Sequence, residues 1–310
     1  MGLFKRHSKD LEGGQGQGPS ANIHQSPPSY SEIEDGHRLE GLPPAYPQPK
    51  PSHFNSLHSH AEDDERDAGD AFCHNNPLFP PSSIDEATLQ RIVSGRLGLT
   101  APPLMTVPET SKLSTWKRFK GEIQPGKGDG TVYIRTKKGT KDTLFVSDAP
   151  LYAAHTYRNV KLYYEITITS LPHPKDASIA IGYAALPYPP FRLPGWHRGS
   201  IAVHSDDGRR YVNDSLGGKD FVLPFSMGET VGLGIDYARK TVFFTRNGKV
   251  DGEWGLVEDA VAPGTDPYRG YRDGGVEGIQ GEFDVFAALG VYGSVGVVVN
   301  LGGSPFKYSI

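Results

Sequence analysis

The sequence predicts an all-β sandwich that follows a long N-terminal segment of different composition. Short apolar runs recur through residues 131–301 with turn residues between them, a spacing typical of sandwiches and barrels. Asn247-Gly248 follows one of these runs and is a strong hairpin signal, because both turn positions favour a positive φ. All three tryptophans and 13 of the 15 tyrosines lie beyond residue 83, which is enough to build one buried core.

Ten segments are predicted as strands, and 162–169 alternates well enough to be half buried. The predicted strands are 131–135, 143–146, 162–169, 178–183, 200–204, 210–213, 230–236, 241–246, 286–291 and 295–301. The last two lie in a charge-free run, 285–306, whose length could suit a membrane span. Its glycines and β-branched residues instead favour two buried strands around Gly293-Ser294.

One short helix is expected before the strands. Ser83-Ile84-Asp85-Glu86 has the pattern of a capping box. The next apolar residues, Leu89, Ile92 and Val93, share one helical face, and Gly95 provides a stop. We expect residues 81–124 to form this helix and a linker packed on the sandwich, and 125–310 to form the sandwich itself.

Residues 1–80 are predicted to be a disordered tail. They contain ten prolines, eight glycines and eight serines but few aliphatic residues, so they cannot bury enough apolar surface to offset chain entropy. The acidic run at 62–65 is interpreted as a solvated linker. On this basis, brief proteolysis should leave a fragment that starts near Pro81.

The tail contains two copies of the motif Pro-Pro-x-Tyr, at Pro27-Pro28-Ser29-Tyr30 and Pro43-Pro44-Ala45-Tyr46. Composition predicts only about 0.1 copies in a chain of this length. Paired prolines preset a polyproline II turn, and the tyrosine fills the neighbouring slot of an aromatic-lined groove. WW domains read this pattern, so Pro27, Pro28, Tyr30, Pro43, Pro44 and Tyr46 are the predicted WW-binding residues.

Several motifs of the sandwich resemble those of SPRY domains. They are Leu162-Tyr163-Tyr164-Glu165, Gly182-Tyr183, Gly195-Trp196, His204-Ser205-Asp206-Asp207-Gly208, Gly232-Leu233-Gly234-Ile235-Asp236, the run 241–248, and Ala288-Leu289-Gly290-Val291-Tyr292 to Asn300. The resemblance covers roughly 125–305 and implies a SPRY (concanavalin A-like) β-sandwich.

The stretch 187–197 is similar to a fungal subgroup of SPRY proteins. Those proteins are endosomal and vacuolar adaptors that recruit a WW-domain HECT ubiquitin ligase to membrane cargo. The resemblance implies a non-catalytic adaptor, cytoplasmic and peripheral on endosomal or vacuolar membranes, whose partners are that ligase and a membrane-protein cargo or its adaptor. The chain differs from the subgroup in having no visible transmembrane anchor and in placing its Pro-Pro-x-Tyr words before the domain.

The longest predicted loop, 186–199, is the expected cargo-binding rim, because loops on a rigid scaffold often carry interaction residues. Aromatic and arginine side chains are the usual anchors of an interface. The predicted cargo-binding residues are Tyr188, Phe191, Arg192, Trp196, His197, Asp206 and Asp207. Two alternatives stay open: Phe191 and Trp196 cover the core, and the two aspartates cap a turn.

Other chemistry is not supported by the sequence. A net charge of −4 argues against a nucleic-acid partner, and the single cysteine, Cys73, excludes an internal disulfide and favours a reducing compartment. The run 121–127 resembles a phosphate-binding loop but leads into a strand, and the tail histidines offer no preformed metal site. We expect no cofactor, no metal and no catalysis, with a lectin-like or glycan-processing sandwich as the alternative.

Overall fold

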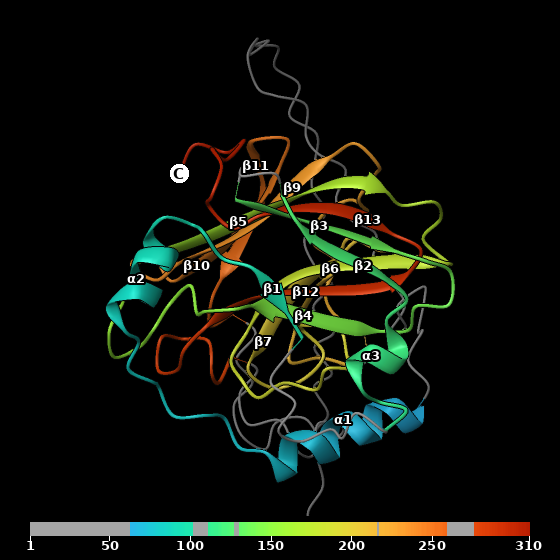
Figure 1. Ribbon diagram of the computed structural model, residues 1–310, viewed down its shortest axis with the longest axis horizontal. Coiled ribbons are helices and arrows are strands. Elements are labelled where there is room, and N and C mark those ends of the chain that lie inside the picture. Colours follow the sequence, from blue (N-terminus) through green and yellow to red (C-terminus); the bar gives the residue numbers. More distant parts are fainter. Residues whose placement is uncertain (1–62, 102–110, 127–129, 216, 259–275) are drawn as a thin grey trace, which may run out of the picture. The chain divides into compact units, whose positions relative to one another are not determined.

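A computed structural model describes residues 63–101, 111–126, 130–215, 217–258 and 276–310. Two β-sheets are stacked face to face (Figure 1). The Pro-Pro-x-Tyr words lie outside the described residues, so their role stays a prediction. Among the residues that are described, no helix is both long and apolar enough to cross a bilayer.

The two sheets contain six and seven strands. The six-stranded sheet has the order β1 (Leu99–Thr100), β4 (Thr143–Ser147), β12 (Phe286–Gly293), β6 (Ala177–Ala184), β7 (Ser200–His204), β8 (Arg210–Val212). The seven-stranded sheet has the order β11 (Lys249–Gly255), β10 (Thr241–Arg246), β9 (Thr230–Asp236), β5 (Lys161–Ser170), β13 (Gly296–Asn300), β3 (Thr131–Thr136), β2 (Gly121–Pro125). All pairings are antiparallel.

The core lies between the sheets and follows the period-2 alternation of the strands. In β6, Ile179, Ile181 and Tyr183 point into it, and Leu162, Tyr164 and other residues of β5 meet them from the opposite sheet. The Tyr164 hydroxyl donates to the carbonyl of Ala288 at 2.8 Å, so the polar tip of this fully buried ring is satisfied.

The all-β prediction is confirmed, and all ten predicted strands are present with small shifts at their ends. Three strands were not predicted: β1, β2 and β11. β11 is the return strand of the Asn247-Gly248 hairpin, in which both residues have positive φ. β2 occupies residues 121–125 of the run that resembles a phosphate-binding loop, so this part of the run is a strand rather than a loop.

The predicted short helix is α2 (Glu86–Val93), but its cap differs from the prediction. Asp85, rather than Ser83, is the N-cap, and its side chain accepts a hydrogen bond from the Thr88 amide at 2.6 Å. Of the expected apolar face, Ile92 is buried while Val93 is 65% exposed. The linker also contains a short helix that was not predicted, α3 (Thr115–Arg118).

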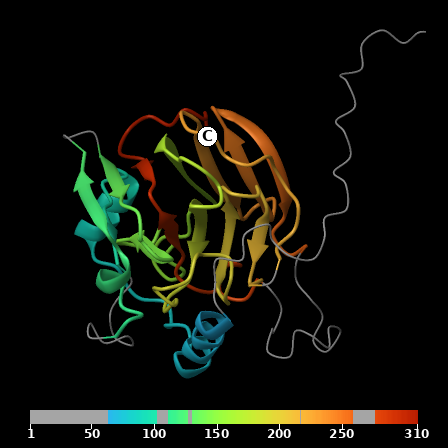
Figure 2. The same cartoon turned by 90° about the vertical axis from the view of Figure 1, so that its right-hand side faces the viewer.

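A further helix, α1 (Asp63–Asn75), corrects the boundary of the predicted disordered tail. The tail prediction extended to residue 80 and treated 62–65 as a solvated linker. Residues 63–75 instead form a helix beside the sandwich, on the side of the six-stranded sheet (Figures 1 and 2). Low mean hydropathy suggested disorder here, whereas contacts with distant residues hold this helix in place.

Candidate functional site

The loop 186–199 covers the outer face of the six-stranded sheet. Tyr188 packs with Leu144, Val146 and Ala288, whose side chains point away from the main core. Leu193 and Trp196 pack with Ala180 and Ala202 in a neighbouring cluster. This explains why every residue of β4, β6 and β7 is buried although only one face of each strand meets the other sheet.

The loop approaches the sheet so closely that one strand residue must be a glycine. A Cβ on Gly290 would lie 2.6 Å from Pro194 Cδ and 2.7 Å from Leu193 Cδ2. Within the loop, the Tyr188 hydroxyl donates to the carbonyl of Leu193 at 2.7 Å and accepts from the His197 amide at 3.1 Å. The loop is therefore a tightly tied layer of the fold, which agrees with the alternative that its aromatic residues cover the core.

All seven predicted cargo-binding residues are largely withdrawn from solvent. Tyr188, Phe191, Arg192, Trp196, His197 and Asp206 are each at most 8% exposed, and Asp207 is half-buried. These residues thus lie in a packed layer rather than on an open rim, and their role in cargo binding stays a prediction. The sequence correctly grouped the loop residues, but it could not show that the loop folds back on a sheet and that a helix lies over it.

The two aspartates lie in the turn between β7 and β8 and are held by hydrogen bonds within the fold. Asp206 accepts a hydrogen bond from the Ser178 hydroxyl at 2.9 Å. Asp207 accepts one from the amide of Arg209 at 2.9 Å and one from the hydroxyl of Tyr211 at 2.7 Å. Burial, followed by the neighbouring Asp206 charge, raises the pKa of Asp207. This geometry supports the turn-cap interpretation.

His204 and Ser205, which could supply a base and a nucleophile for hydrolysis, are part of the same packed layer. Its ring stacks on Tyr211 with centroids 4.1 Å apart, and its Nε2 lies 2.9 Å from the carbonyl of Pro194. Burial lowers the pKa of His204. Ser205 Oγ accepts from the Ile179 amide at 2.8 Å. The two side chains have structural partners and form no nucleophile–base pair.

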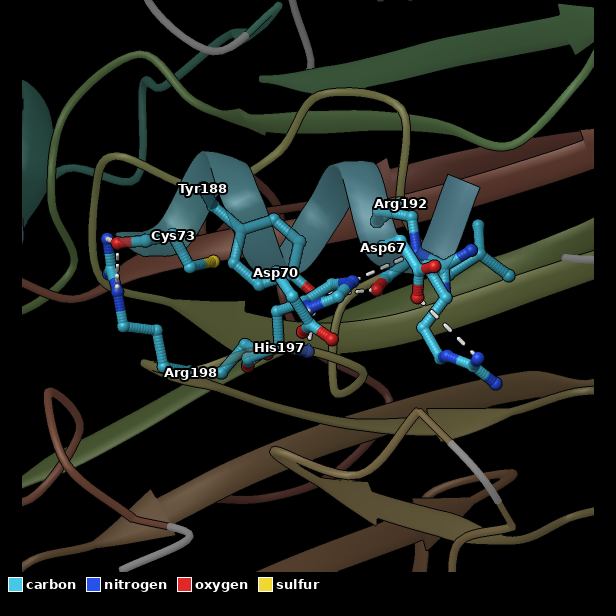
Figure 3. Close-up of polar contacts among 10 residues, drawn as sticks. Asp67, Asp70, Cys73, Tyr188, Arg192, His197 and Arg198 are labelled. Carbon is cyan, nitrogen blue, oxygen red and sulfur yellow. Dashed lines mark hydrogen bonds and ion pairs between the residues drawn. The ribbon is translucent and has the colours of Figure 1, made fainter. Parts of the chain in front are cut away.

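Helix α1 lies directly over the loop (Figure 3). Phe72 meets Phe191 edge to face with ring centroids 6.4 Å apart, and Ala68, Cys73 and Leu113 pack around them. Gly69 faces His197, and a Cβ there would lie 2.3 Å from Nε2 of that ring. We call the surface under the helix, made by Leu113, Arg118, Phe191, His197 and Arg198, the α1 footprint.

Polar contacts join α1 to the footprint along its whole length. Near its start, Glu65 accepts two hydrogen bonds from the Arg118 guanidinium, at 2.9 and 2.8 Å, in the bidentate geometry that favours arginine over lysine. At its end, Arg198 donates to the carbonyls of Cys73 and Asn76. A cation at this position satisfies the free carbonyls of a helix C-terminus and complements its dipole.

The middle contact is through His197, and its hydrogen bonds determine the tautomer. Arg192 Nε can only donate, so Nε2 of His197, 3.0 Å away, accepts. The proton of the neutral ring is then on Nδ1, which donates to Asp70 Oδ1 at 3.0 Å (Figure 3). His197 thereby links a helix carboxylate to a buried guanidinium.

The side chains of Arg192 and Asp142 are buried beneath the α1 footprint. Arg192 is fully buried, with its guanidinium carbon 4.3 Å from the centre of the Trp196 ring. Burial lowers the Arg192 pKa, and the negative charge of Asp142 opposes that change. Burial also raises the pKa of Asp142 to about 7, against the charges of Arg192 and Arg118. A hollow of about 530 Å³ beside the start of α1 is lined in part by Glu65, Arg118, Lys141 and Asp142.

Sequence reasoning missed Glu65, Gly69, Asp70 and Phe72, because they were assigned to the tail. Two weak signals were present: acidic residues gather at the start of the segment, where a helix dipole favours them, and Ala68 and Phe72 are spaced i,i+4. Gly69 and the low apolar content oppose a helix prediction.

Within the described ranges, no group of three His, Cys, Asp or Glu side chains could hold a metal ion.

Comparison with known proteins agrees with the predicted SPRY resemblance. The SPRY domain family matches residues 161–253. This segment starts at β5 and ends in β11, and the strands on either side of it complete both sheets.

Fungal proteins provide the similar sequences. "Protein ssh4" of Sclerotinia sclerotiorum is 35% identical over 135 residues, which is 44% of this chain and 21% of that protein. SPRY domain-containing protein C285.10c of Schizosaccharomyces pombe is 40% identical over 91 residues, 29% of this chain and 23% of that protein. The chain thus spans about a fifth of the length of these curated relatives. A resemblance to fungal SPRY proteins is confirmed.

Two solved SPRY domains are also similar. A human SPRY domain has a TM-score of 0.37 and 20% identity, and covers 58% of this chain and 94% of that chain. The SPRY domain of human HERC1 has a TM-score of 0.39 and 11% identity, with the same coverage of 58% and 94%.

Proposed function

We propose that this protein is a non-catalytic adaptor that recruits a WW-domain HECT ubiquitin ligase to protein cargo. The observation that carries the proposal is the pairing, in one chain, of two Pro-Pro-x-Tyr words with a SPRY domain similar to fungal Ssh4 proteins. SPRY domains are protein-interaction modules. In this proposal the tail binds the ligase, and the sandwich binds a membrane protein or its adaptor for endosomal and vacuolar turnover.

Two motifs in one chain can engage two WW domains of one ligase. Such bivalent binding raises avidity by roughly 10²–10⁴ over a single motif where the geometry permits it. The spacer between the motifs has 12 residues (31–42), which corresponds to an r.m.s. reach of about 20 Å for a flexible chain. That reach suits closely spaced WW domains.

The test is a pull-down of the full chain with the WW region of a HECT ligase. Tyr30→Ala/Tyr46→Ala removes both rings that fill the WW slots, so ligase binding should fall to background. Each single variant should retain weak binding. Tyr133→Ala, at a 44% exposed tyrosine of β3, is the matched control and should bind like wild type. Undiminished binding by the double variant would refute ligase recruitment by these motifs.

The alternative, a lectin-like or glycan-processing sandwich, is tested by applying the same protein to a glycan array and a hydrolysis assay. Glycosidases need a pair of carboxylates about 5–9.5 Å apart that flank the bond to be cleaved. The adaptor proposal expects neither glycan binding nor hydrolysis, and reproducible saccharide turnover would replace it.

A further inference from the structure

Helix α1 has a sequence that gives it little stability of its own. It has 13 residues, a glycine in its middle and one large buried apolar side chain, Phe72. Isolated helices of about 12–15 residues are marginal in water even when they are rich in alanine, and glycine is among the weakest helix formers. The helix therefore depends on the surface that receives it.

That surface offers cations and hydrogen-bond donors where the helix is acidic. Glu65 lies on Arg118, which is only 4% exposed, and Asp70 lies on His197. Arg198 meets the negative end of the helix dipole. Charge, dipole and shape are all complementary, so the α1 footprint has the properties of a binding site for an acidic helix.

The site also has hydrogen-bonding capacity that α1 does not use. Both terminal nitrogens of Arg192 and one of Arg198 are buried without a hydrogen-bond acceptor among the described residues. Buried donors normally find partners, because leaving them unpaired is costly. In the part of the chain that the structure describes, α1 thus leaves these three donors without an acceptor.

We propose that the α1 footprint is a docking site for an acidic amphipathic helix of a partner protein, and that α1 is its intramolecular competitor. The spacing in α1 defines the partner motif: a carboxylate at position i, a small residue at i+4, a second carboxylate at i+5 and an aromatic residue at i+7. These positions correspond to Glu65, Gly69, Asp70 and Phe72.

This inference rests on the proposed function in one respect, because it identifies the partner helix with the protein cargo. A tethered competitor acts at an effective concentration that is commonly in the millimolar range. Any weakening of α1 therefore increases the apparent affinity of the footprint for a partner helix, without a new contact.

The experiment uses the full chain and a fluorescent peptide with the sequence of residues 63–76. The variant Asp70→Ala/Phe72→Ala changes α1 alone and leaves the footprint intact. We expect it to bind the peptide at least tenfold more tightly than wild type. Asp67→Ala is the matched control, because this side chain is 73% exposed on the same helix, and it should bind like wild type.

The receiving surface is tested in the same assay. Adding Arg198→Ala to the variant should reduce peptide affinity at least tenfold, because it removes the donor to the helix C-terminus. A peptide with E65K and D70K should not bind. Equal binding by wild type and variant, or by the charge-reversed peptide, would overturn the proposal.

Hydrogen exchange of the α1 amides provides a second measurement on unmodified protein. We expect them to exchange faster than the amides of β5 and β6 but slower than those of a free peptide. Protection equal to that of the strands would make α1 a fixed part of the fold and overturn the proposal. If the double variant is not folded, Gly69→Ala replaces it, since its Cβ forces α1 away from His197.

The inference and the proposed function fail separately. Peptide binding does not involve the Pro-Pro-x-Tyr words, and the WW pull-down does not involve α1. Loss of peptide binding with a normal Tyr30/Tyr46 pull-down result would remove the competitor model and leave ligase recruitment. If the peptide binds as expected but the Tyr30/Tyr46 double variant still binds the ligase at the wild-type level, the competitor model stands and ligase recruitment by these motifs is refuted.

Discussion

The two outer faces of the sandwich are covered in different ways. On the seven-stranded sheet, Tyr163 is stacked on Phe243, with centroids 5.9 Å apart, and contacts Phe306 and Tyr308 of the C-terminal segment. On the six-stranded sheet, the loop 186–199 forms an apolar layer. Helix α1 lies over this layer through one aromatic contact, Phe72 on Phe191, and otherwise through an ion pair and helix-end hydrogen bonds.

The difference indicates which of the two covering segments, the C-terminal segment or α1, a partner protein can displace. Aromatic packing is lost without replacement when a segment leaves, because water does not restore it. Ion pairs and exposed carbonyls are partly compensated by hydration, and they weaken as salt rises. The C-terminal segment therefore belongs to the fold, whereas α1 is suited to reversible docking.

The largest effect is expected from the apolar layer itself. Tyr188→Ala should destabilise the domain by about 3–5 kcal/mol, because it empties a fully buried site. For a domain of this size that corresponds to a fall in Tm of roughly 6–20 °C. Tyr163→Ala on the opposite face should have a similar effect, which circular dichroism melts can compare. If the Tm of Tyr188→Ala lay within 2 °C of the wild-type Tm, this loop would not be a structural layer.

The next effect concerns the buried charge under α1. The folded-state pKa of Asp142, about 7, lies above its ordinary value of 3.8 because burial disfavours the charged form. The folded state then binds a proton that the unfolded state has released. The contribution of Asp142 to stability therefore falls as pH rises from about 4 to 7, by at most about 1.4 kcal/mol per pH unit.

Asp142→Asn should flatten this part of the stability profile, measured by urea unfolding between pH 4 and 8. Asp85→Asn is a control of opposite sign when the profile is extended below pH 4, since hydrogen bonds from Thr88 lower the Asp85 pKa from 3.8 and its contribution is lost only as pH falls below that value. An unchanged slope in Asp142→Asn would contradict the buried-charge assignment.

A smaller effect is expected from salt. Raising ionic strength from 0.05 to 1 M should weaken the ion pairs of α1 and increase tryptic cleavage after Arg66 about tenfold or less. The C-terminal cover should not respond, because it depends on aromatic packing. With a protease of broad specificity, brief digestion at low salt should leave a fragment that starts near residue 62, and high salt should move its start toward the Pro81 predicted from composition. Salt-independent cleavage would show that apolar contacts dominate α1 docking.

The smallest effect is expected at the turn between β7 and β8. Asp207→Ala removes two hydrogen bonds at a half-buried position and should cost about 1 kcal/mol, measured by urea unfolding. It should leave binding of the α1 peptide unchanged, because Asp207 is not part of the footprint. A change in peptide affinity would return Asp207 to the contact surface.

Much of the fold could be predicted from local patterns. Alternation in 162–169 and the Asn247-Gly248 turn are local signals, and the strands they predict are present. β1 and β2 were not predicted, since they are short edge strands whose burial is low and whose pairing is set by distant neighbours. The candidate site was recognised only in part: Arg192 and His197 were singled out as cargo contacts, but their burial beneath α1 was not predicted.

The sequence by itself determined the all-β class, the SPRY resemblance and the two Pro-Pro-x-Tyr motifs. Periodicity, turn chemistry and short motifs depend only on residues that are neighbours in the chain. Tertiary structure alone decided that the loop 186–199 is a buried layer and that residues 63–75 form a helix. Both outcomes depend on contacts between residues more than 50 positions apart, such as Arg118 with Glu65 and His197 with Asp70. The energy of such contacts exists only after the chain has folded.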